Sequence, residues 1–441
     1  MQGFTRHHMS QCSTRGVGTA AVAIALVAVL AGCTNPASDA ETGDGDVVTL
    51  TIAMEAEQAG GNPAFDAVLD NFDATHDDIV IKRVYPPLDQ YETLLNTQVQ
   101  GGNAPDLFAA VAGSGSNLSV LRLGKAGKLM DLSDQTWADQ VLPAAYRPLY
   151  EVDGALYGLP LAYNAAVPIY RTDLFDQAGI TPPTTKQELL DDCRDSLDRL
   201  GKPFMAMPGA EQYGIGYFAA IVATTVVLGE NPQWNQQHES GEVTFSGSSE
   251  WQEALQYIVD MNDAGCFPET AVADTFETAP AQAANGDTLS FGPGEASAVP
   301  NLQAINPDAS FDVFALPGLT EATTVMPMSP IRAVVASATT KHKEAVLEVL
   351  DFFATTDQQV AFASGGNYIP VSAVGTGETG NATLTGISDF LAHPERTSPN
   401  INLMWPSADS YTVMQQQVQG LLSGQKSVND ILQAMDAAWP Q

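Results

Sequence analysis

Residues 47–54, "VVTLTIAM", open the folded part of the chain and decide its fold class. This run of β-branched and aliphatic residues predicts a buried strand. Asn62 and Pro63 then supply a cap and a first-turn proline for a helix. Ile79–Tyr85 predicts a second strand, and Tyr91–Gln100 predicts a second helix. Strands that alternate with helices in this way predict a mostly parallel sheet covered by helices, and therefore an α/β fold.

A second region begins near Tyr157. Residues 156–171, "LYGLPLAYNAAVPIYR", form an extended apolar stretch with two prolines, which does not fit inside one compact βα unit. We interpret this stretch as a crossing between two lobes. The 441 residues also exceed what one hydrophobic core usually serves. The expected first lobe comprises residues 47–160 with about 300–340, and the expected second, helix-rich lobe comprises residues 161–299 with about 341–441.

The N-terminal segment predicts export. Residues 1–16 are basic and contain no acid, and Val17–Gly32 is an apolar run of about 16 residues, short of the ~20 that a membrane-spanning helix needs. We therefore expect a signal peptide over residues 1–32. The segment that ends in Cys33, "LAGC", resembles the bacterial lipobox, in which the cysteine is lipidated, and residues 33–46 are polar and acidic like a flexible tether. We expect no other stretch long and apolar enough to cross a bilayer.

The charge balance of the chain is strongly acidic. Lys and Arg total 18 against 52 Asp and Glu, which gives a net charge of −34. A nucleic acid would be repelled by such a surface, so we expect no nucleic-acid partner. A well-solvated surface explains the acidity, which therefore does not identify a ligand.

Two cysteines remain once Cys12, in the expected signal peptide, and Cys33 are set aside. Cys193 and Cys266 can form one disulfide in the oxidising compartment that export implies. Two separate buried thiols are the alternative, because the sequence gives no distance between these residues.

Common catalytic signatures are missing from the sequence. It contains no G-x-S-x-G, H-E-x-x-H or G-x-x-x-x-G-K-[ST] motif. The histidines beyond the expected signal peptide are scattered, with none four residues from another, so we expect no metal site built from them. Gly375, Gly377 and Gly380 match the spacing of a dinucleotide fingerprint but lack its strand and helix. We expect neither an enzyme nor a cofactor.

Residues suited to a small polar ligand stand at breaks between the expected elements. Sugars present hydroxyl groups and weakly apolar ring faces, so their sites combine amide or carboxylate partners with stacked aromatic rings. Glu55 and Glu57 follow the first strand, at the edge where open α/β sheets bind ligands. The other candidates of these types are Tyr163, Asn164, Tyr213, Tyr217, Tyr368 and Trp405. Ordinary core packing is the alternative for the aromatic residues, and a solvated loop is the alternative for the two acids.

Several motifs along the chain resemble those of one family. They are "DDIVIK" at residues 77–82, "GGNAPDLF" at 101–108, "KAGKLMDL" at 125–132, "DGALYGLP" at 153–160 and "GNYIPV" at 366–371. Together these segments resemble the carbohydrate-binding group of the extracellular solute-binding proteins that serve bacterial ABC importers.

The resemblance implies the periplasmic-binding-protein-like fold of type II. In this fold two α/β lobes, joined by a hinge, close on a ligand in the cleft between them. It also implies a lipoprotein that is anchored through Cys33 to the outer face of the cell membrane. Such a protein binds a sugar or oligosaccharide and delivers it to the permease subunits of an ABC importer. We expect it to be a monomer.

The resemblance also implies particular ligand contacts. Asn164 is expected beside the hinge, and Asn367 and Tyr368 are expected to face the cleft. Arg171 and residues 276–294, "FETAPAQAANGDTLSFGPG", depart from the family pattern. Phe291 and Gly292 are the ligand contacts expected in that stretch. The alternatives are a binder of a non-sugar solute, such as a polyol or polyamine, and a secreted enzyme that acts on glycosides.

Overall fold

The computed structural model of the protein describes residues 47–56 and 61–440. The expected signal peptide over residues 1–32, the tether over residues 33–46, the lipid attachment at Cys33 and the candidate ligand residue Glu57 lie outside the described residues. They stay predictions.

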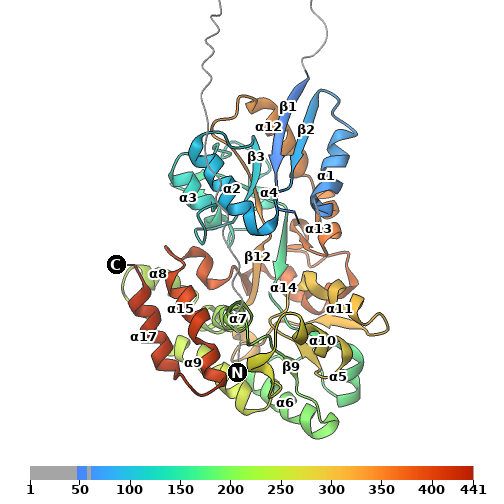
Figure 1. The fold of residues 1–441 in the computed structure, drawn as a ribbon, viewed down its shortest axis with the longest axis vertical. Coiled ribbons are helices and arrows are strands. Elements are labelled where there is room, and N and C mark those ends of the chain that lie inside the picture. Colours follow the sequence, from blue (N-terminus) through green and yellow to red (C-terminus); the bar gives the residue numbers. More distant parts are fainter. Residues whose placement is uncertain (1–46, 57–60, 441) are drawn as a thin grey trace, which may run out of the picture. The chain divides into compact units, whose positions relative to one another are not determined.

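The first sheet has five strands in the order β2-β1-β3-β13-β6. Figure 1 labels β1, β2 and β3 of this sheet. Its strands are β1 (Val48–Ala53), β2 (Ile79–Val84), β3 (Leu107–Ala110), β6 (Leu159–Pro160) and β13 (Ala333–Ala336). The helices that follow the first three strands are α1 (Pro63–Asp73), α2 (Leu88–Gly101) and α3 (Val120–Lys125), and α4 (Ala138–Val141) comes next. β1 is parallel to β2 and β3, whereas β13 is antiparallel to both of its neighbours. The expected alternation of strands and helices is confirmed for β1 to β3, but the expected mostly parallel sheet is not, because two of its four strand pairings are antiparallel.

The second sheet has four short strands in the order β11-β8-β10-β9 and is surrounded mostly by helices. Its strands are β8 (Ile169–Arg171), β9 (Met205–Ala206), β10 (Ser290–Phe291) and β11 (Phe311–Val313). Its helices are α5 (Thr172–Ala178), α6 (Lys186–Leu200), α7 (Gln212–Glu230), α8 (Trp234–Glu239), α9 (Ser249–Asp263), α10 (Thr278–Asn285), α11 (Val299–Ile305), α15 (Asp409–Gln417), α16 (Gln419–Leu422) and α17 (Val428–Ala438). We propose that this sheet and these helices form the helix-rich second lobe.

A third sheet connects the other two. Its order is β14-β7-β12-β15, with β7 (Ala162–Ala165), β12 (Met326–Pro330), β14 (Ile369–Pro370) and β15 (Thr397–Ser398). The stretch over residues 156–171 supplies β6 to the first sheet, β7 to the third and β8 to the second. The chain returns through β12 and β13, which belong to the third and first sheets. The interpretation of residues 156–171 as a crossing is therefore consistent with this topology.

Two parts of the chain join a different lobe from the one expected. β11 pairs with β8 of the second sheet, although residues 300–340 were assigned to the first lobe. α12 (Lys343–Phe353) and α13 (Thr356–Gly366) pack on α1 of the first lobe, where Phe353 and Phe362 lie 5.7 and 6.5 Å from Phe65 between ring centroids. The partners of these elements are distant in sequence. We propose that residues 300–325 belong to the second lobe and 331–373 to the first.

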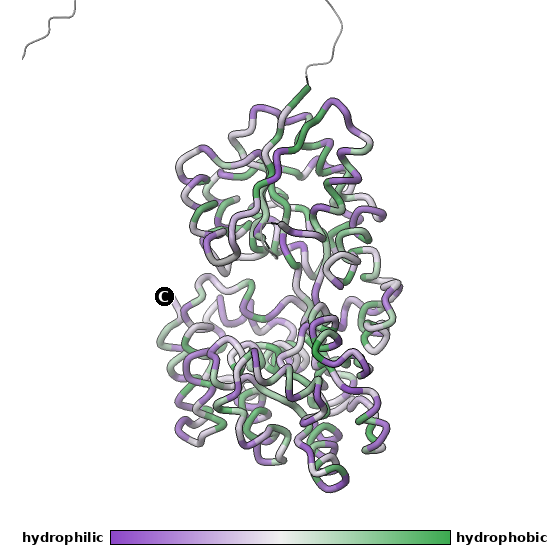
Figure 2. The backbone as a smooth tube through the Cα atoms, turned by 45° about the vertical axis from the view of Figure 1, so that its right-hand side comes forward, coloured by the Kyte–Doolittle hydropathy of each residue, from purple (hydrophilic) through white to green (hydrophobic). Residues whose placement is uncertain are grey.

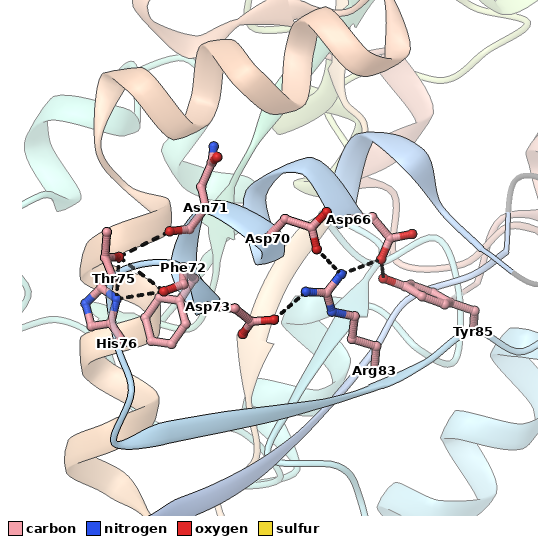
Figure 3. Close-up of polar contacts among 9 residues, drawn as sticks. All are labelled: Asp66, Asp70, Asn71, Phe72, Asp73, Thr75, His76, Arg83 and Tyr85. Carbon is pink, nitrogen blue, oxygen red and sulfur yellow. Dashed lines mark hydrogen bonds and ion pairs between the residues drawn. The ribbon is translucent and has the colours of Figure 1, made fainter.

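An arginine fastens α1 to β2. The Arg83 guanidinium lies 2.7 Å from Asp70 and 2.6 Å from Asp73, and it donates to Asp66 at 3.0 Å (Figure 3). Tyr85 donates a hydrogen bond to the same Asp66 carboxylate. The three acids are four and three residues apart and therefore share one face of the helix. This face meets the end of β2 and fixes the position of the helix on the sheet.

Most apolar residues are buried in two cores, one around the first sheet and one around α7 and α9. Apolar segments run along the strands and inner helical turns, whereas many outer turns are hydrophilic (Figure 2). Contrary to expectation, α7 is long and apolar enough to cross a bilayer by length and composition. However, 83% of its apolar window is buried inside the protein, as in the core helix of a globular lobe.

A disulfide joins two helical segments of the second lobe. Cys193 on α6 is bonded to Cys266, which follows α9, and their Cα atoms are 4.8 Å apart. Both side chains are fully buried. Of the two alternatives for these cysteines, the structure therefore has the disulfide.

An acidic residue on α6, Asp192, should make the stability of the protein depend on pH. Burial, together with the charges of Asp195, Glu188 and Asp191, raises the pKa of Asp192 to about 7. The native state therefore binds a proton that the unfolded state has lost between about pH 4 and pH 7, so this group makes stability fall as the pH rises through that window. We expect Asp192→Asn to raise the free energy of unfolding by about 1–2 kcal/mol at pH 8 and to leave it unchanged near pH 3, after allowance for solvent screening.

Urea unfolding at the two pH values checks this prediction. Asp191→Asn, on the exposed side of the same helix, is the matched control and should give a smaller gain. Equal stability of Asp192→Asn and the wild type at pH 8 would contradict the prediction.

Candidate functional site

Two cavities adjoin an aromatic wall at the start of α7. The larger cavity has a volume of about 450 Å³ and the smaller one about 240 Å³. Tyr213, Tyr217 and Glu295 line both cavities. The larger cavity is otherwise lined by second-lobe residues, among them Phe276, Glu277, Phe291, Asn301 and Leu302.

The wall consists of two tyrosines one helical turn apart. Tyr213 and Tyr217 are at i and i+4 on α7, and their rings stack with centroids 5.3 Å apart and planes 10° apart. Tyr217 is buried, whereas Tyr213 is 55% exposed and therefore presents a ring face to a ligand.

Glu295 connects this wall to the crossing between the lobes. Tyr217 donates to Glu295 Oε1 at 3.0 Å, and Asn164 Nδ2, on β7, donates to Oε2 at 2.9 Å. Asn164 is held in place because it also donates to Ser297 Oγ at 2.8 Å and accepts from the Ser297 backbone N–H at 3.2 Å. Burial raises the pKa of Glu295, and the hydrogen bond from Tyr217 partly opposes that shift.

The smaller cavity joins residues from both lobes. Val111 and Ala112 follow β3 of the first sheet, Ser329 lies on β12, and Asn400 and Tyr411 come from the C-terminal part of the chain. The buried Asn400 Oδ1 has no hydrogen-bond partner among the described residues. An unpaired buried acceptor is costly, so a donor from a ligand or water would be favourable here. The cavity is therefore part of a cleft between the lobes.

Close backbone contacts border this cleft. Gly113 has a φ of 78°, and a Cβ atom at this position would lie 2.4 Å from the carbonyl oxygen of Leu403. Ser114 donates to the Trp405 carbonyl oxygen at 2.6 Å. Only glycine permits both the left-handed backbone and this approach.

The structure brings four of the expected ligand residues together. Tyr213 and Tyr217 form the wall, Phe291 lines the larger cavity, and Asn164 contacts the wall through Glu295. Gly292 lies next to Phe291 but lines neither cavity, and its Cα packs so closely that a Cβ atom would lie 2.5 Å from Met205 Sδ.

Five other expected residues lie elsewhere. Tyr163 is fully buried against Tyr146, with ring centroids 4.8 Å apart. Trp405 is buried among aromatic residues of the second core and lines a different cavity. Glu55 is buried in an ion pair with Arg332. In these three cases the protein itself supplies the partner that we expected from a ligand.

The segment at the end of α13 also differs from expectation. Tyr368 stacks on Phe362, with ring centroids 5.7 Å apart, and lines a separate cavity of about 250 Å³. Asn367 has a φ of 54°, caps α13 and donates to the Ala296 carbonyl oxygen at 3.0 Å. Asn367 therefore supports the loop that carries Glu295, and neither residue lines the cleft.

The sequence analysis missed Glu295, Asn400, Phe276 and Tyr411. Glu295 follows directly after the stretch from which Phe291 and Gly292 were chosen, so the segment was identified but not its polar residue. Asn400 follows a proline in a loop and gave no periodic signal. Among the described residues, no group of three or more His, Cys, Asp or Glu side chains is placed to hold a metal ion.

Comparisons with known proteins identify the family. Residues 67–374 match the bacterial extracellular solute-binding proteins. A binding protein of Brucella abortus is 28% identical over 191 residues, 43% of this chain and 42% of that protein. The melibiose/raffinose/stachyose-binding protein MelE of Bacillus subtilis is 27% identical over 165 residues, 37% of this chain and 36% of MelE. The matched part thus spans less than half the length of these curated relatives.

Solved structures support the same fold over more of the chain. A family 1 extracellular solute-binding protein from Bifidobacterium longum subsp. infantis is 20% identical with a TM-score of 0.73, covering 90% of this chain and 99% of that one. RafE from Streptococcus pneumoniae is 19% identical, also with a TM-score of 0.73, covering 90% of this chain and all of RafE (100%). The expected two-lobed fold is confirmed, and the chain belongs to the family of bacterial extracellular solute-binding proteins.

Proposed function

We propose that the protein binds a sugar or oligosaccharide in the cleft beside Tyr213 and delivers it to the permease of an ABC importer. The observation that carries this proposal is the stacked pair of Tyr213 and Tyr217 next to the Glu295 carboxylate. An exposed aromatic face suits a sugar ring, and carboxylate and amide oxygens suit its hydroxyl groups. Family membership supports binding rather than catalysis and a location outside the cytoplasm.

The names of similar proteins support the same class of ligand. MelE is named for melibiose, raffinose and stachyose, and another relative, from Halalkalibacterium halodurans, is named for arabinooligosaccharides. RafE has been solved with raffinose and a Bacillus licheniformis sugar transporter with stachyose. We propose an oligosaccharide for this chain as well.

The crossing strands provide a route for closure. β7 and β12 lie side by side in the third sheet, and the segments on either side of them enter different sheets. Rotation of the lobes about these segments would trap a ligand that contacts both, and the ligand would stabilise the closed state by its greater affinity for it. We also propose a monomer that is tethered by lipid on Cys33.

A polyamine is the second candidate ligand. Two carboxylates, those of Glu277 and Glu295, line the larger cavity together with four aromatic rings, and this combination also suits an organic cation.

A ligand screen tests the proposal. Thermal unfolding of the soluble protein from Val47 would be measured with raffinose, stachyose, arabino-, xylo- and chito-oligosaccharides, polyols and spermidine. Binding to the native state raises its stability by mass action, so a ligand raises the unfolding temperature. Stabilisation by spermidine alone, or by none of the saccharides, would contradict the sugar proposal.

The exposed ring should contribute much of the affinity. We expect Tyr213→Ala to weaken the binding of a saccharide hit by about 1–2 kcal/mol, because stacking and buried area are lost. Titration calorimetry measures the change. Tyr368→Ala is the matched control, because Tyr368 lines a separate cavity, and it should leave the affinity unchanged. A larger loss in Tyr368→Ala than in Tyr213→Ala would assign the ligand to the other cavity.

A further inference from the structure

The two cavities share one acidic side chain, that of Glu295, and no basic side chain in the described part of the chain lines either of them. Among the described residues that line either cavity there is no Lys, Arg or His, whereas Glu277 and Glu295 are both present. Glu277 is exposed at the start of α10. Glu295 instead lies in the wall common to both cavities, so a ligand that fills either one approaches its carboxylate.

The hydrogen bonds of Glu295 fit its charged form. Both of its described partners, Tyr217 Oη and Asn164 Nδ2, are donors. The Asn164 amide cannot be turned around without loss, because its Oδ1 accepts from the Ser297 backbone N–H. A charged carboxylate accepts both hydrogen bonds as they stand, whereas a protonated carboxyl group would have to reverse its hydrogen bond with Tyr217.

A second negative charge in this cleft would be poorly tolerated. A buried carboxylate is poorly solvated, and burial accordingly raises the pKa of Glu295. Like charges a few ångströms apart repel much more strongly in such surroundings than in water. No cation among the cavity-lining residues offsets this repulsion.

On the basis of the proposed function, we infer that Glu295 determines ligand specificity by charge. It admits neutral or amine-bearing saccharides and excludes uronates and other anionic sugars of the same size. A binding site rejects a wrong ligand most effectively when it contains a repulsive element as well as attractive ones. Glu295 is that repulsive element, and its hydrogen bonds to Tyr217 and Asn164 hold it in the wall.

Matched pairs of sugars at neutral pH test this inference. The pairs are galactobiose with digalacturonate, cellobiose with cellobiouronic acid, and raffinose with the uronate made by oxidising the galactose C6 hydroxyl. Titration calorimetry gives the ratio of Kd values within each pair. We expect each neutral sugar that binds to bind at least about tenfold more tightly than its acid. Glu295→Gln should reduce that ratio to about threefold or less.

Two further variants separate charge from structure. Glu295→Asp keeps the charge and should keep most of the ratio. Glu269→Gln removes an exposed acid that lines neither cavity, and it should leave the ratio unchanged. Altered packing would weaken the binding of both sugars of a pair and would therefore cancel in the ratio of their Kd values. Thermal unfolding shows whether each variant is folded.

The outcomes distinguish the inference from the function on which it rests. If the wild type binds both members of a pair equally, the inference fails while the proposed function stands. An unchanged ratio in Glu295→Gln also overturns it, because the exclusion then has another source. If none of the neutral sugars binds, the proposed function fails and the inference falls with it.

Discussion

Replacing both Cys193 and Cys266 with serine lowers the free energy of unfolding of the second lobe by about 4 kcal/mol. The disulfide joins residues 73 positions apart. Closing a loop of this length lowers the conformational entropy of the unfolded chain, and the expected effect lies between about 3 and 5 kcal/mol. Both sulfur atoms are also buried, so the variant loses a tight contact between α6 and the end of α9.

Tryptophan fluorescence during urea unfolding is a suitable measurement. Trp234, Trp251, Trp405 and Trp439 all pack in or against the second core, so their emission reports mainly on that lobe. Reduction of the wild type should shift the midpoint as the double variant does. A double variant that unfolds at the wild-type urea concentration would show that the crosslink contributes nothing.

Arg332→Met lowers the free energy of unfolding by about 3–5 kcal/mol. Arg332 Nε lies 2.5 Å from Glu55 Oε1, and the two side chains are 18 and 11% exposed. Glu55 Oε2 is buried and has no hydrogen-bond partner among the described residues. Removal of the guanidinium therefore leaves a carboxylate with neither water nor a cation, and such a buried charge is strongly destabilising.

A double variant isolates the cause of this loss. Glu55→Gln combined with Arg332→Met removes both charges and should recover most of the lost stability. Urea unfolding of the wild type, both single variants and the double variant gives the interaction energy. Additive losses in the double variant would show that the two residues act independently.

The sequence predicted elements whose signals are local. The β-branched run over residues 47–54 and the Asn62 cap depend on neighbours within one turn or strand, and both occur as expected. The stretch over residues 156–171 could also be interpreted as a crossing between lobes, because its prolines interrupt any helix. It divides among three sheets.

Partners across long sequence distances could not be predicted in this way. β11 pairs with β8, and nothing in its own sequence distinguishes the sheet of β8 from that of β3. The apolar face of α12 shows that the helix is covered, and only the folded chain shows that α1 covers it.

Residue type identified only part of the candidate site, because it does not show which side chains the core encloses. Tyr213 and Tyr217 were expected at a break between elements, but both lie on α7, where a spacing of four residues puts them on one face. Tyr163 and Trp405 have equally suitable rings, but these are enclosed by the core. Glu55 meets its cation 277 positions further along the chain. Glu295 was overlooked because an acid in a loop rich in Gly and Pro usually faces water.

The order of strands in the first sheet has a consequence for dissection of the molecule. β6 and β13 are neighbours in that sheet, yet the whole of the second sheet lies between them in sequence. Cleavage of the chain at a single site between residues 169 and 313 would therefore not separate the two lobes. The N-terminal fragment would keep β6 and the C-terminal fragment β13, and these two strands would stay paired in the first sheet. The first lobe could be produced alone only by joining the end of β6 directly to the start of β13.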